Sequence, residues 1–250
     1  GFLPWFKNRI HFQGKQIFYC HRRVDLICTA YEGLEQFFPK QKIRLTGNPV
    51  RKNLSADEIS REEAHKLFDL SPNKKTILVL GGSLGARTLN QAMLNRVESA
   101  QPIKNQFIWQ CGKYYFDEIN KRVDTEKKSE VRLLAFISRM DAAYCAADVI
   151  ISRAGALSVS ELCLMGKPVI LVPSPNVSED HQTKNAMSLV RSDAALMVKD
   201  VDCDKDLIQK AESLLLNKEL SGKLSNNIKA MARPNATADI VNETEKLILK

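Results

Sequence analysis

From residue 76 onward, short apolar runs alternate with longer segments whose apolar residues recur every three or four positions. The short runs are rich in Val, Ile and Leu, which is typical of strands buried on both faces of a sheet. The longer segments have helical periodicity, as in Leu89, Met93 and Val97. The predicted strands are 76–80, 107–110, 131–134, 149–151, 169–172 and 195–198, and the predicted helices pass through 89–97, 114–122, 140–146, 158–165 and 182–191.

Strands that alternate with helices in this way pair in parallel and are joined by right-handed crossovers. We therefore predict an α/β fold with a Rossmann-like, doubly wound parallel sheet. Ligands of such folds bind at the carboxyl ends of the strands. Polar and glycine-rich motifs that directly follow a strand are therefore the candidate site residues.

The two ends of the chain follow other patterns. Segments 24–29 and 43–45 predict two further strands, which fit the end of a preceding α/β domain, and a linker with Asn48, Pro49 and Asn53 follows them. The tail predicts amphipathic helices over 206–216, 221–231 and 236–249, interrupted by Pro234. The predicted division is a remnant of an amino-terminal domain at 1–47, a main domain at 48–235 and a terminal helix at 236–250.

Bulk composition narrows the class of protein. The 250 residues are 44% hydrophobic, and no apolar run approaches the ~18 residues of a membrane span. The first residues lack the layout of a signal peptide, which favours either the cytoplasm or a chain that has lost its true start. The net charge of +8 suits a polyanionic ligand or an anionic membrane, whereas no motif supports nucleic-acid binding. The six cysteines are scattered, so we expect buried free thiols.

The stretch 148–161 combines a predicted strand, a small-residue turn and a helix start. Free N–H groups and the positive end of the helix dipole make such a junction an anion site, and a phosphate-bearing ligand is the natural candidate. Ser158 and Glu161 have the spacing of a capping box. Glu161 either closes that cap or accepts hydrogen bonds from a ribose diol one turn from the phosphate, and the residues alone favour the cap.

The glycine-rich loop 81–86 also follows a predicted strand and opens a helix. Its glycines let a ligand approach the backbone and Ser83 adds a hydroxyl donor, but the packing of a tight turn explains the glycines equally well. The next strand ends in Gln110 and Cys111, without the carboxylate of a nicotinamide site, and no Lys occupies a Walker-A position. We therefore predict no cofactor.

Two further polar clusters each have two interpretations. The amide and imidazole groups of His181, Gln182 and Asn185 suit sugar hydroxyls, whereas the plainer interpretation of this segment is an N-cap by Asp180. The D-x-D sequence at 202–204 matches a metal-binding form found in sugar-nucleotide transferases. Helix capping and dipole matching explain that sequence more simply, so we assign no metal.

Five segments occur in the order, and near the spacing, of the MurG family of peptidoglycan glycosyltransferases. They are 47–51 (Gly-Asn-Pro-Val-Arg), 81–90 (Gly-Gly-Ser-Leu-Gly-Ala-Arg with Leu89 and Asn90), 136–140 (Phe136, Ile137 and Met140), 152–161 and 180–185. The chain resembles this family over residues 24–250, which include the whole carboxy-terminal, donor-binding domain.

The resemblance implies a GT-B fold, in which two Rossmann-like domains face a cleft. It also implies inverting transfer of N-acetylglucosamine from UDP-N-acetylglucosamine to lipid I, which gives lipid II. By resemblance, Ile137 holds the uracil through its backbone, Glu161 binds the ribose, and Gln182 with Asn185 binds the sugar. The implied contacts to the donor phosphates are Arg51, Ser83 and the helix start of Ala156, Leu157, Ser158, Val159 and Ser160. With the family in view, the ribose role of Glu161 leads over the cap.

The sequence departs from the family in one respect. The glycine-rich motif that faces the lipid acceptor, and that supplies the general base, does not occur in it. We therefore assign no catalytic residue, and we expect donor binding from this chain and full transfer only from the intact protein.

The implied partners are UDP-N-acetylglucosamine and lipid I, on the cytoplasmic side of the bacterial inner membrane, where the family acts as a peripheral enzyme. The alternatives are an enzyme like the UDP-N-acetylglucosamine 2-epimerases and a non-catalytic nucleotide-sugar-binding fragment. The basic, aromatic head at 1–23 suits contact with an anionic membrane. We favour the interpretation that the head is a domain remnant.

Overall fold

The computed structural model describes residues 24–31, 35, 38–51, 54, 59–123, 129–177 and 180–249. These residues form two parallel sheets. The small sheet pairs β1 (Ile27–Thr29) with β2 (Ile43–Leu45). The large sheet has six strands in the order β5-β4-β3-β6-β7-β8. Its strands are β3 (Thr76–Leu80), β4 (Gln106–Gln110), β5 (Val131–Leu134), β6 (Val149–Ser152), β7 (Val169–Leu171) and β8 (Leu196–Met197).

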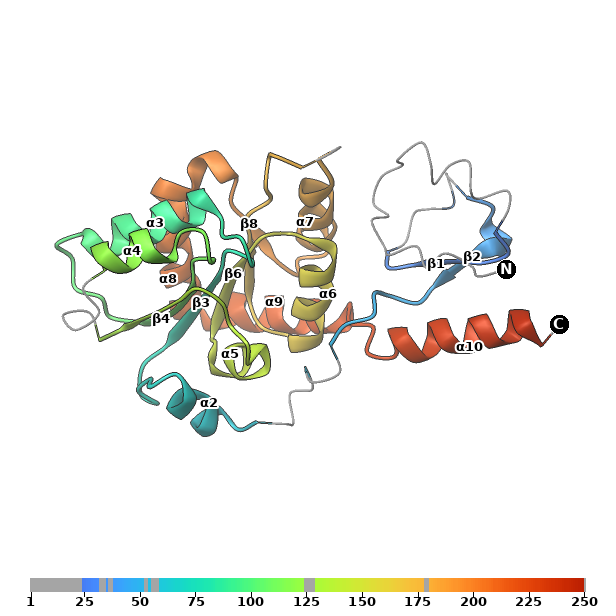
Figure 1. Cartoon of the computed structure of the whole chain (residues 1–250), viewed down its shortest axis with the longest axis horizontal. Coiled ribbons are helices and arrows are strands. Elements are labelled where there is room, and N and C mark those ends of the chain that lie inside the picture. Colours follow the sequence, from blue (N-terminus) through green and yellow to red (C-terminus); the bar gives the residue numbers. More distant parts are fainter. Residues whose placement is uncertain are drawn as a thin grey trace.

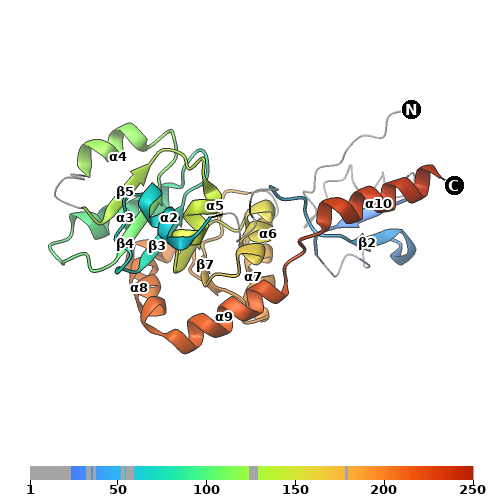
Figure 2. The same ribbon diagram turned by 90° about the horizontal axis from the view of Figure 1, so that it is seen from below.

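Helices connect the strands and cover both faces of the large sheet (Figure 1). The α-helices are α2 (Arg61–Leu67), α3 (Arg87–Glu98), α4 (Phe116–Arg122), α5 (Met140–Ala146), α6 (Ala156–Met165), α7 (His181–Arg191), α8 (Ile208–Leu216), α9 (Lys218–Ala230) and α10 (Ala236–Ile248). Two 3-10 helices, η1 (Lys40–Lys42) and η3 (Asp200–Asp202), and a π-helical turn, η4 (Cys203–Leu207), complete the described elements. Figure 2 shows α9 running from α8 toward α10 below the sheet.

The predicted doubly wound parallel sheet is present, and most predicted boundaries lie within two residues of the observed ones. Two helices begin earlier than predicted. Helix α6 begins at Ala156 because Gly155 already has the extended conformation of an N-cap. Helix α9 begins at Lys218 because the Asn217 side chain accepts a hydrogen bond from the Leu220 N–H at 3.0 Å. The head at 1–23 lies outside the described residues.

Side chains on successive strand positions enter two separate apolar layers. Leu78 and Ile150 pack on one side of the sheet, whereas Val79 and Ile151 pack on the other. The first layer is completed by α2, α5, α6 and α7, and the second by α3, α4 and α8. Because both faces are covered, the strands consist of continuous apolar runs and show no polar alternation.

The site edge of the sheet is defined by its strand order. Strand β3 pairs with β4 on one side and with β6 on the other. The chain therefore leaves the sheet in opposite directions after β3 and after β6, and the loops that follow them flank a crevice between the strand ends. These two loops are the two glycine-containing motifs of the sequence.

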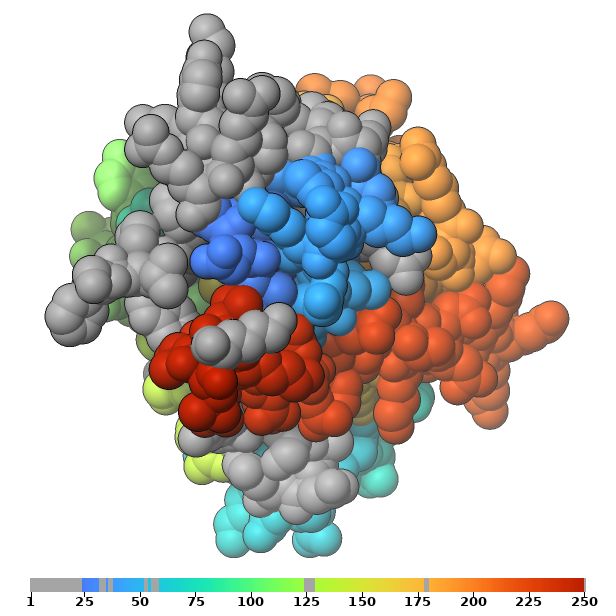
Figure 3. Space-filling view, turned by 90° about the vertical axis from the view of Figure 1, so that its right-hand side faces the viewer, coloured from blue at the N-terminus to red at the C-terminus, as the bar shows by residue number. Residues whose placement is uncertain are grey.

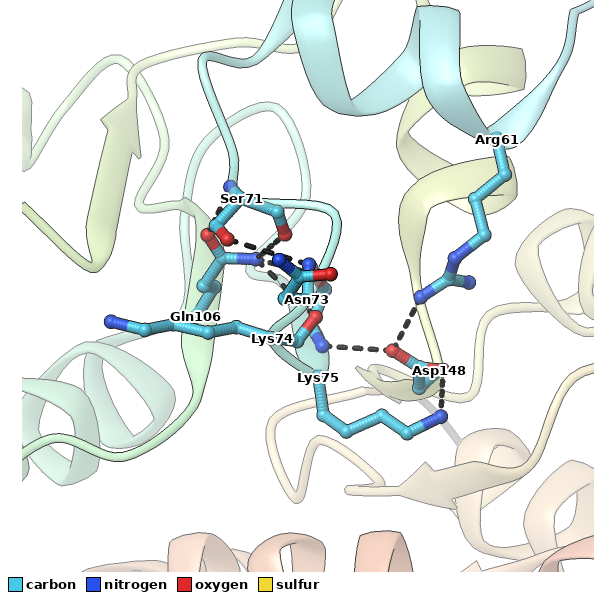
Figure 4. Close-up of polar contacts among 8 residues, drawn as sticks. Arg61, Ser71, Asn73, Lys74, Lys75, Gln106 and Asp148 are labelled. Atoms are coloured by element: carbon cyan, nitrogen blue, oxygen red, sulfur yellow. Dashed lines mark hydrogen bonds and ion pairs between the residues drawn. The ribbon is translucent and has the colours of Figure 1, made fainter.

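Asp148 joins α2 to the opposite, amino-terminal edge of the sheet (Figure 4). Its carboxylate accepts hydrogen bonds from Arg61 Nη2 at 2.7 Å, Lys75 Nζ at 2.9 Å and the Thr76 N–H at 2.9 Å. Burial alone would raise the pKa of Asp148. The Thr76 N–H, Lys75 and Arg61 outweigh burial and hold that pKa below its ordinary value of 3.8.

We expect the Asp148→Asn variant to lose about 2 kcal/mol of unfolding free energy at pH 6, because it breaks a largely buried ion pair. Since the folded pKa is depressed, this contribution is complete above pH 3.8 and disappears as the pH falls through the lower folded value. Urea unfolding at pH 6 and pH 3 measures the effect. The control is Asp193→Asn, which breaks an exposed pair with Lys223. A gap between Asp148→Asn and wild type that is no smaller at pH 3 than at pH 6 would contradict this assignment.

The small sheet lies against the last helix. Arg44 of β2 forms an ion pair with Glu243 of α10 at 3.2 Å. Gly47 has a φ of +88°, and a Cβ at this position would lie 2.5 Å from Arg233 Cβ. Figure 3 shows the segment 38–51, which contains β2 and Gly47, side by side with α10 on one face of the molecule. The exposed residues of α10 include Val241 and Ile248.

The described cysteines are free thiols. Cys111, Cys163 and Cys203 are buried, as predicted, whereas Cys28 and Cys145 are half-buried, and Cys20 lies outside the described residues. Burial raises the pKa of the Cys111 thiol to about 11 and that of Cys163 to about 12. Within the described ranges, no helix is both long and apolar enough to cross a membrane.

Candidate functional site

The glycine loop after β3 interlocks with the loop after β4. Gly85 and Gly112 both have a φ near +90°. A Cβ on Gly85 would lie 2.2 Å from the Cys111 carbonyl oxygen, and one on Gly112 would lie 2.2 Å from the Gly85 nitrogen. These two glycines therefore serve packing.

Gly82 is different, because its φ is +81° but a Cβ there would meet nothing within 4 Å. The exposed part of the loop, Gly82 and Ser83, therefore faces open space at the strand ends. The Lys113 N–H holds this part by donating to the Ser83 carbonyl at 3.3 Å.

The helix that follows β6 begins without a side-chain cap. Gly155 is the N-cap residue, and no side chain accepts from the first turn of α6. Leu157 is 54% exposed, and Ser158 is half-buried. The first-turn N–H groups therefore stay available to an anion at the positive end of the helix dipole.

The predicted capping box between Ser158 and Glu161 is wrong. Because the helix begins two residues earlier than predicted, Ser158 lies inside the first turn and Glu161 lies further along the helix. The capping box that the described residues do contain joins Ser60 and Glu63 at the start of α2, a helix that the sequence analysis missed.

Glu161 is a buried carboxylate that bridges three segments of the chain. It is 8% exposed. Its Oε1 accepts a hydrogen bond from Arg51 Nε at 3.1 Å, and its Oε2 accepts one from the Tyr144 hydroxyl at 3.2 Å. Arg51 comes from the linker and Tyr144 from α5, so Glu161 brings the linker, α5 and α6 together.

The linker also contacts the start of α6. The Asn48 side-chain amide donates to Ser160 Oγ at 3.0 Å and to the Ala156 carbonyl at 3.4 Å. The Tyr31 hydroxyl donates to the same carbonyl at 3.2 Å. The Ser160 side chain is therefore turned toward the linker, and Val159 is fully buried in the core. The Val159 N–H donates to the Gly155 carbonyl at 2.9 Å, so the N–H groups that are available to a ligand are those of residues 156–158.

Gln182 and Asn185 hold neighbouring loops. Gln182 Oε1 accepts from the Ser174 N–H at 2.9 Å, which closes the loop after β7. Asn185 is 1% exposed, and its amide donates to the Ala154 carbonyl at 2.9 Å. Its Oδ1 is buried and has no partner among the described residues. The Asp180 carboxylate accepts from the Thr183 hydroxyl, and no side-chain hydrogen bond caps the start of α7.

The loop after β5 presents one exposed and one buried residue. Phe136 is 47% exposed, and Ile137 is 2% exposed. The Lys113 ammonium lies 5.8 Å from the centre of the Phe136 ring. Strand β4 lies between β5 and β3, so the loop after β4 lies between the loop that holds Ile137 and the loop that holds Ser83. The predicted uracil and phosphate contacts therefore lie along one continuous edge.

Arg153 is a structural residue of this edge that the sequence analysis missed. Its guanidinium donates to the Val172 and Pro173 carbonyls, to the Asp200 carboxylate and to the Thr88 hydroxyl. The loop after β6 is thereby fixed to the first turn of α3 and to the loop after β7. A charged residue directly after a buried strand was the available signal. Within the described part of the chain, no cluster of three or more His, Cys, Asp or Glu is suited to a metal.

Comparisons with known proteins agree with this fold. A family model described as the glycosyltransferase family 28 C-terminal domain matches residues 76–243. A protein of Parabacteroides distasonis, named UDP-N-acetylglucosamine--N-acetylmuramyl-(pentapeptide) pyrophosphoryl-undecaprenol N-acetylglucosamine transferase, is 50% identical over 229 residues, which are 92% of this chain and 62% of that protein. A protein of Flavobacterium psychrophilum with the same name is 51% identical over 227 residues, which are 91% of this chain and 61% of that protein.

A crystal structure of MurG from Acinetobacter baumannii resembles this chain with a TM-score of 0.69 and 27% identity, covering 94% of this chain and 64% of that one. The doubly wound sheet, the uncapped helix start and these likenesses define a glycosyltransferase of the GT-B type, which confirms the predicted fold class. The chain belongs to glycosyltransferase family 28, and residues 76–243 match that family's carboxy-terminal domain. It spans about 60% of the length of the curated relatives that it matches.

Proposed function

We propose that this chain binds UDP-N-acetylglucosamine at the carboxyl edge of its large sheet. The observation that carries the proposal is the buried Glu161 carboxylate, which lies on the same helix as the uncapped N–H groups of the first turn. The N–H groups that can bind an anion and the carboxylate are separated by about one helical turn, roughly 5 Å. This separation matches the spacing between the phosphate and the ribose of a nucleotide. The names of the two relatives, which contain UDP-N-acetylglucosamine, support this donor.

The proposed contacts follow the order of the loops along the edge. The backbone N–H groups of 156–158, the Ser83 hydroxyl and the Arg51 guanidinium bind the two phosphates. Glu161 accepts from the ribose hydroxyls, and the backbone of Ile137 binds the uracil. Gln182 and Asn185 bind the sugar, and each also holds a backbone group of a neighbouring loop.

The intact protein is proposed to transfer N-acetylglucosamine to lipid I with inversion, giving lipid II for peptidoglycan synthesis. In such a transfer the bond from the anomeric carbon to the phosphate oxygen breaks, and negative charge develops on the departing UDP. The α6 dipole and Arg51 stabilise that charge. A general base must remove the proton of the acceptor hydroxyl, and no residue of this chain is assigned that role.

Domain organisation and location are part of the same proposal. Residues 1–47 belong to the acceptor domain, 48–235 form the donor-binding domain, and 236–250 form a helix that packs back on the acceptor domain. The ion pair between Arg44 and Glu243 supports this division. The intact protein acts as a peripheral enzyme on the cytoplasmic side of the inner membrane, and the net charge of +8 suits an anionic surface.

Titration calorimetry of the chain with UDP-N-acetylglucosamine tests donor binding. We expect one site with measurable heat, and no heat with GDP-mannose, whose base and sugar differ. An absence of heat with UDP-N-acetylglucosamine would refute the proposal. A parallel assay of the chain for lipid II formation should show no turnover, since no base is assigned, and robust turnover would show that the chain contains one.

A further inference from the structure

Tyr144 lies beneath Glu161 and has no role in the contacts proposed above. It occupies the middle of α5 and is 1% exposed. Its ring belongs to the apolar layer shared by α2, α5, α6 and α7. Its hydroxyl is the polar group that this side chain carries into the layer, and that hydroxyl donates to Glu161 Oε2 at 3.2 Å.

The protonation state of Tyr144 makes it a permanent donor. Burial, and then the neighbouring charge of Glu161, raise the pKa of Tyr144 above its ordinary value of 10. The hydroxyl therefore keeps its proton at neutral pH. It donates to Glu161 Oε2 and holds that oxygen toward α5.

The two partners of Glu161 differ in how firmly they are held. Tyr144 is fixed by the core, whereas the side chain of Arg51 is 49% exposed and extends from the linker. Arg51 is also a proposed phosphate ligand, so donor binding competes for its guanidinium. Tyr144 alone can therefore fix the carboxylate plane of Glu161 both with and without a nucleotide.

We propose that Tyr144 is a positioning residue for ribose recognition, which holds Glu161 so that its remaining lone pairs face the 2′- and 3′-hydroxyls of the donor. Tyr144 does not contact the nucleotide itself. The inference rests on the proposed function, because it requires Glu161 to bind the ribose. It predicts that loss of the Tyr144 hydroxyl reduces the contribution of the ribose hydroxyls to nucleotide binding. A tyrosine that only fills the core would not have this effect.

The test compares UDP with 2′-deoxy-UDP by titration calorimetry on the full chain. The variants are Tyr144→Phe, Glu161→Gln and the combination of the two. Tyr31→Phe is the matched control, because it also removes a buried hydroxyl bonded to α6, but one that donates to the Ala156 carbonyl. Thermal unfolding of each variant separates folding from binding.

Wild type should prefer UDP over 2′-deoxy-UDP. Tyr144→Phe should weaken UDP binding about three- to tenfold, which is less than the loss of a direct hydrogen bond to a charged group because Tyr144 acts only through Glu161. It should weaken 2′-deoxy-UDP by a smaller factor, since that nucleotide keeps only the 3′-hydroxyl. Tyr31→Phe should keep the wild-type preference. In the Glu161→Gln background the loss of the Tyr144 hydroxyl should have little further effect on the preference.

Two outcomes overturn the inference in distinguishable ways. If wild type prefers UDP and Tyr144→Phe keeps the same preference, Tyr144 only fills the core, whatever the change in melting temperature. If wild type does not bind UDP, or binds both nucleotides equally, the proposed nucleotide site or its ribose contact fails first and the role of Tyr144 fails with it.

Discussion

Glu161→Gln is expected to weaken the binding of UDP-N-acetylglucosamine about 100-fold. Glutamine keeps the shape of the side chain but replaces one acceptor oxygen with a donor and removes the charge. Hydrogen bonds to a charged group contribute roughly 1.5–3 kcal/mol each, so the loss of the ribose contacts amounts to about 3 kcal/mol. The Tyr144 hydroxyl and Arg51 also lose their ionised partner.

Titration calorimetry measures this loss, and circular dichroism verifies that the variant is folded. The control is Glu118→Gln, whose side chain is exposed on α4 and is not among the proposed contacts. It should bind like wild type. An affinity of Glu161→Gln within threefold of wild type would exclude a direct ribose contact by this carboxylate.

Gly85→Ala is expected to destabilise the fold by at least about 3 kcal/mol, which is at the severe end of single substitutions. An L-residue at a φ of +88° costs roughly 1–2 kcal/mol. In addition, the new Cβ would lie 2.2 Å from the Cys111 carbonyl oxygen, so the loops after β3 and β4 must separate. Because the clash is with backbone, no side-chain rotation relieves it.

Gly82→Ala is the matched control, because it lies in the same loop and has a φ of +81° but an open surrounding. It should cost only the backbone strain, about 1 kcal/mol. It should nevertheless weaken nucleotide binding, since its methyl group points into the space assigned to the phosphates. Urea unfolding and calorimetry separate the two effects. Equal destabilisation by both variants would contradict the steric account of Gly85.

The sequence predicted the large sheet well because its signals are local. Most strands are short apolar runs, and β3, β4, β6 and β7 are buried along their whole length. Periodicity and length alone therefore marked β3, β5 and α5 at their observed bounds. Helix α2 was missed because its sequence, REEAHKL, has almost no apolar stripe, yet its Ser60–Glu63 capping box was readable. The same spacing at Ser158 and Glu161 led to a wrong prediction of a capping box, because this spacing also occurs inside any helix.

The surroundings of the site residues were not predictable in this way. Arg51, Tyr144 and Glu161 come from the linker, α5 and α6, and no periodicity links positions so far apart. Arg153 was overlooked for the same reason, since its partners Thr88 and Asp200 are distant in sequence. The resemblance to a family named the residues that we propose as ligand contacts, whereas the residues that support them required the structure.

The central position of β3 also has a consequence for how the chain is made. Strand β4 is synthesised soon after β3, but β6, its other neighbour, follows about 70 residues after β3. At ribosomal rates of about 5–20 residues per second, one apolar edge of β3 waits several seconds for its partner. Unpaired edges of this kind invite aggregation. Nascent chains that end before residue 149 should therefore bind chaperones far more strongly than chains that include β6, and ribosome-bound chains of the two lengths provide the comparison.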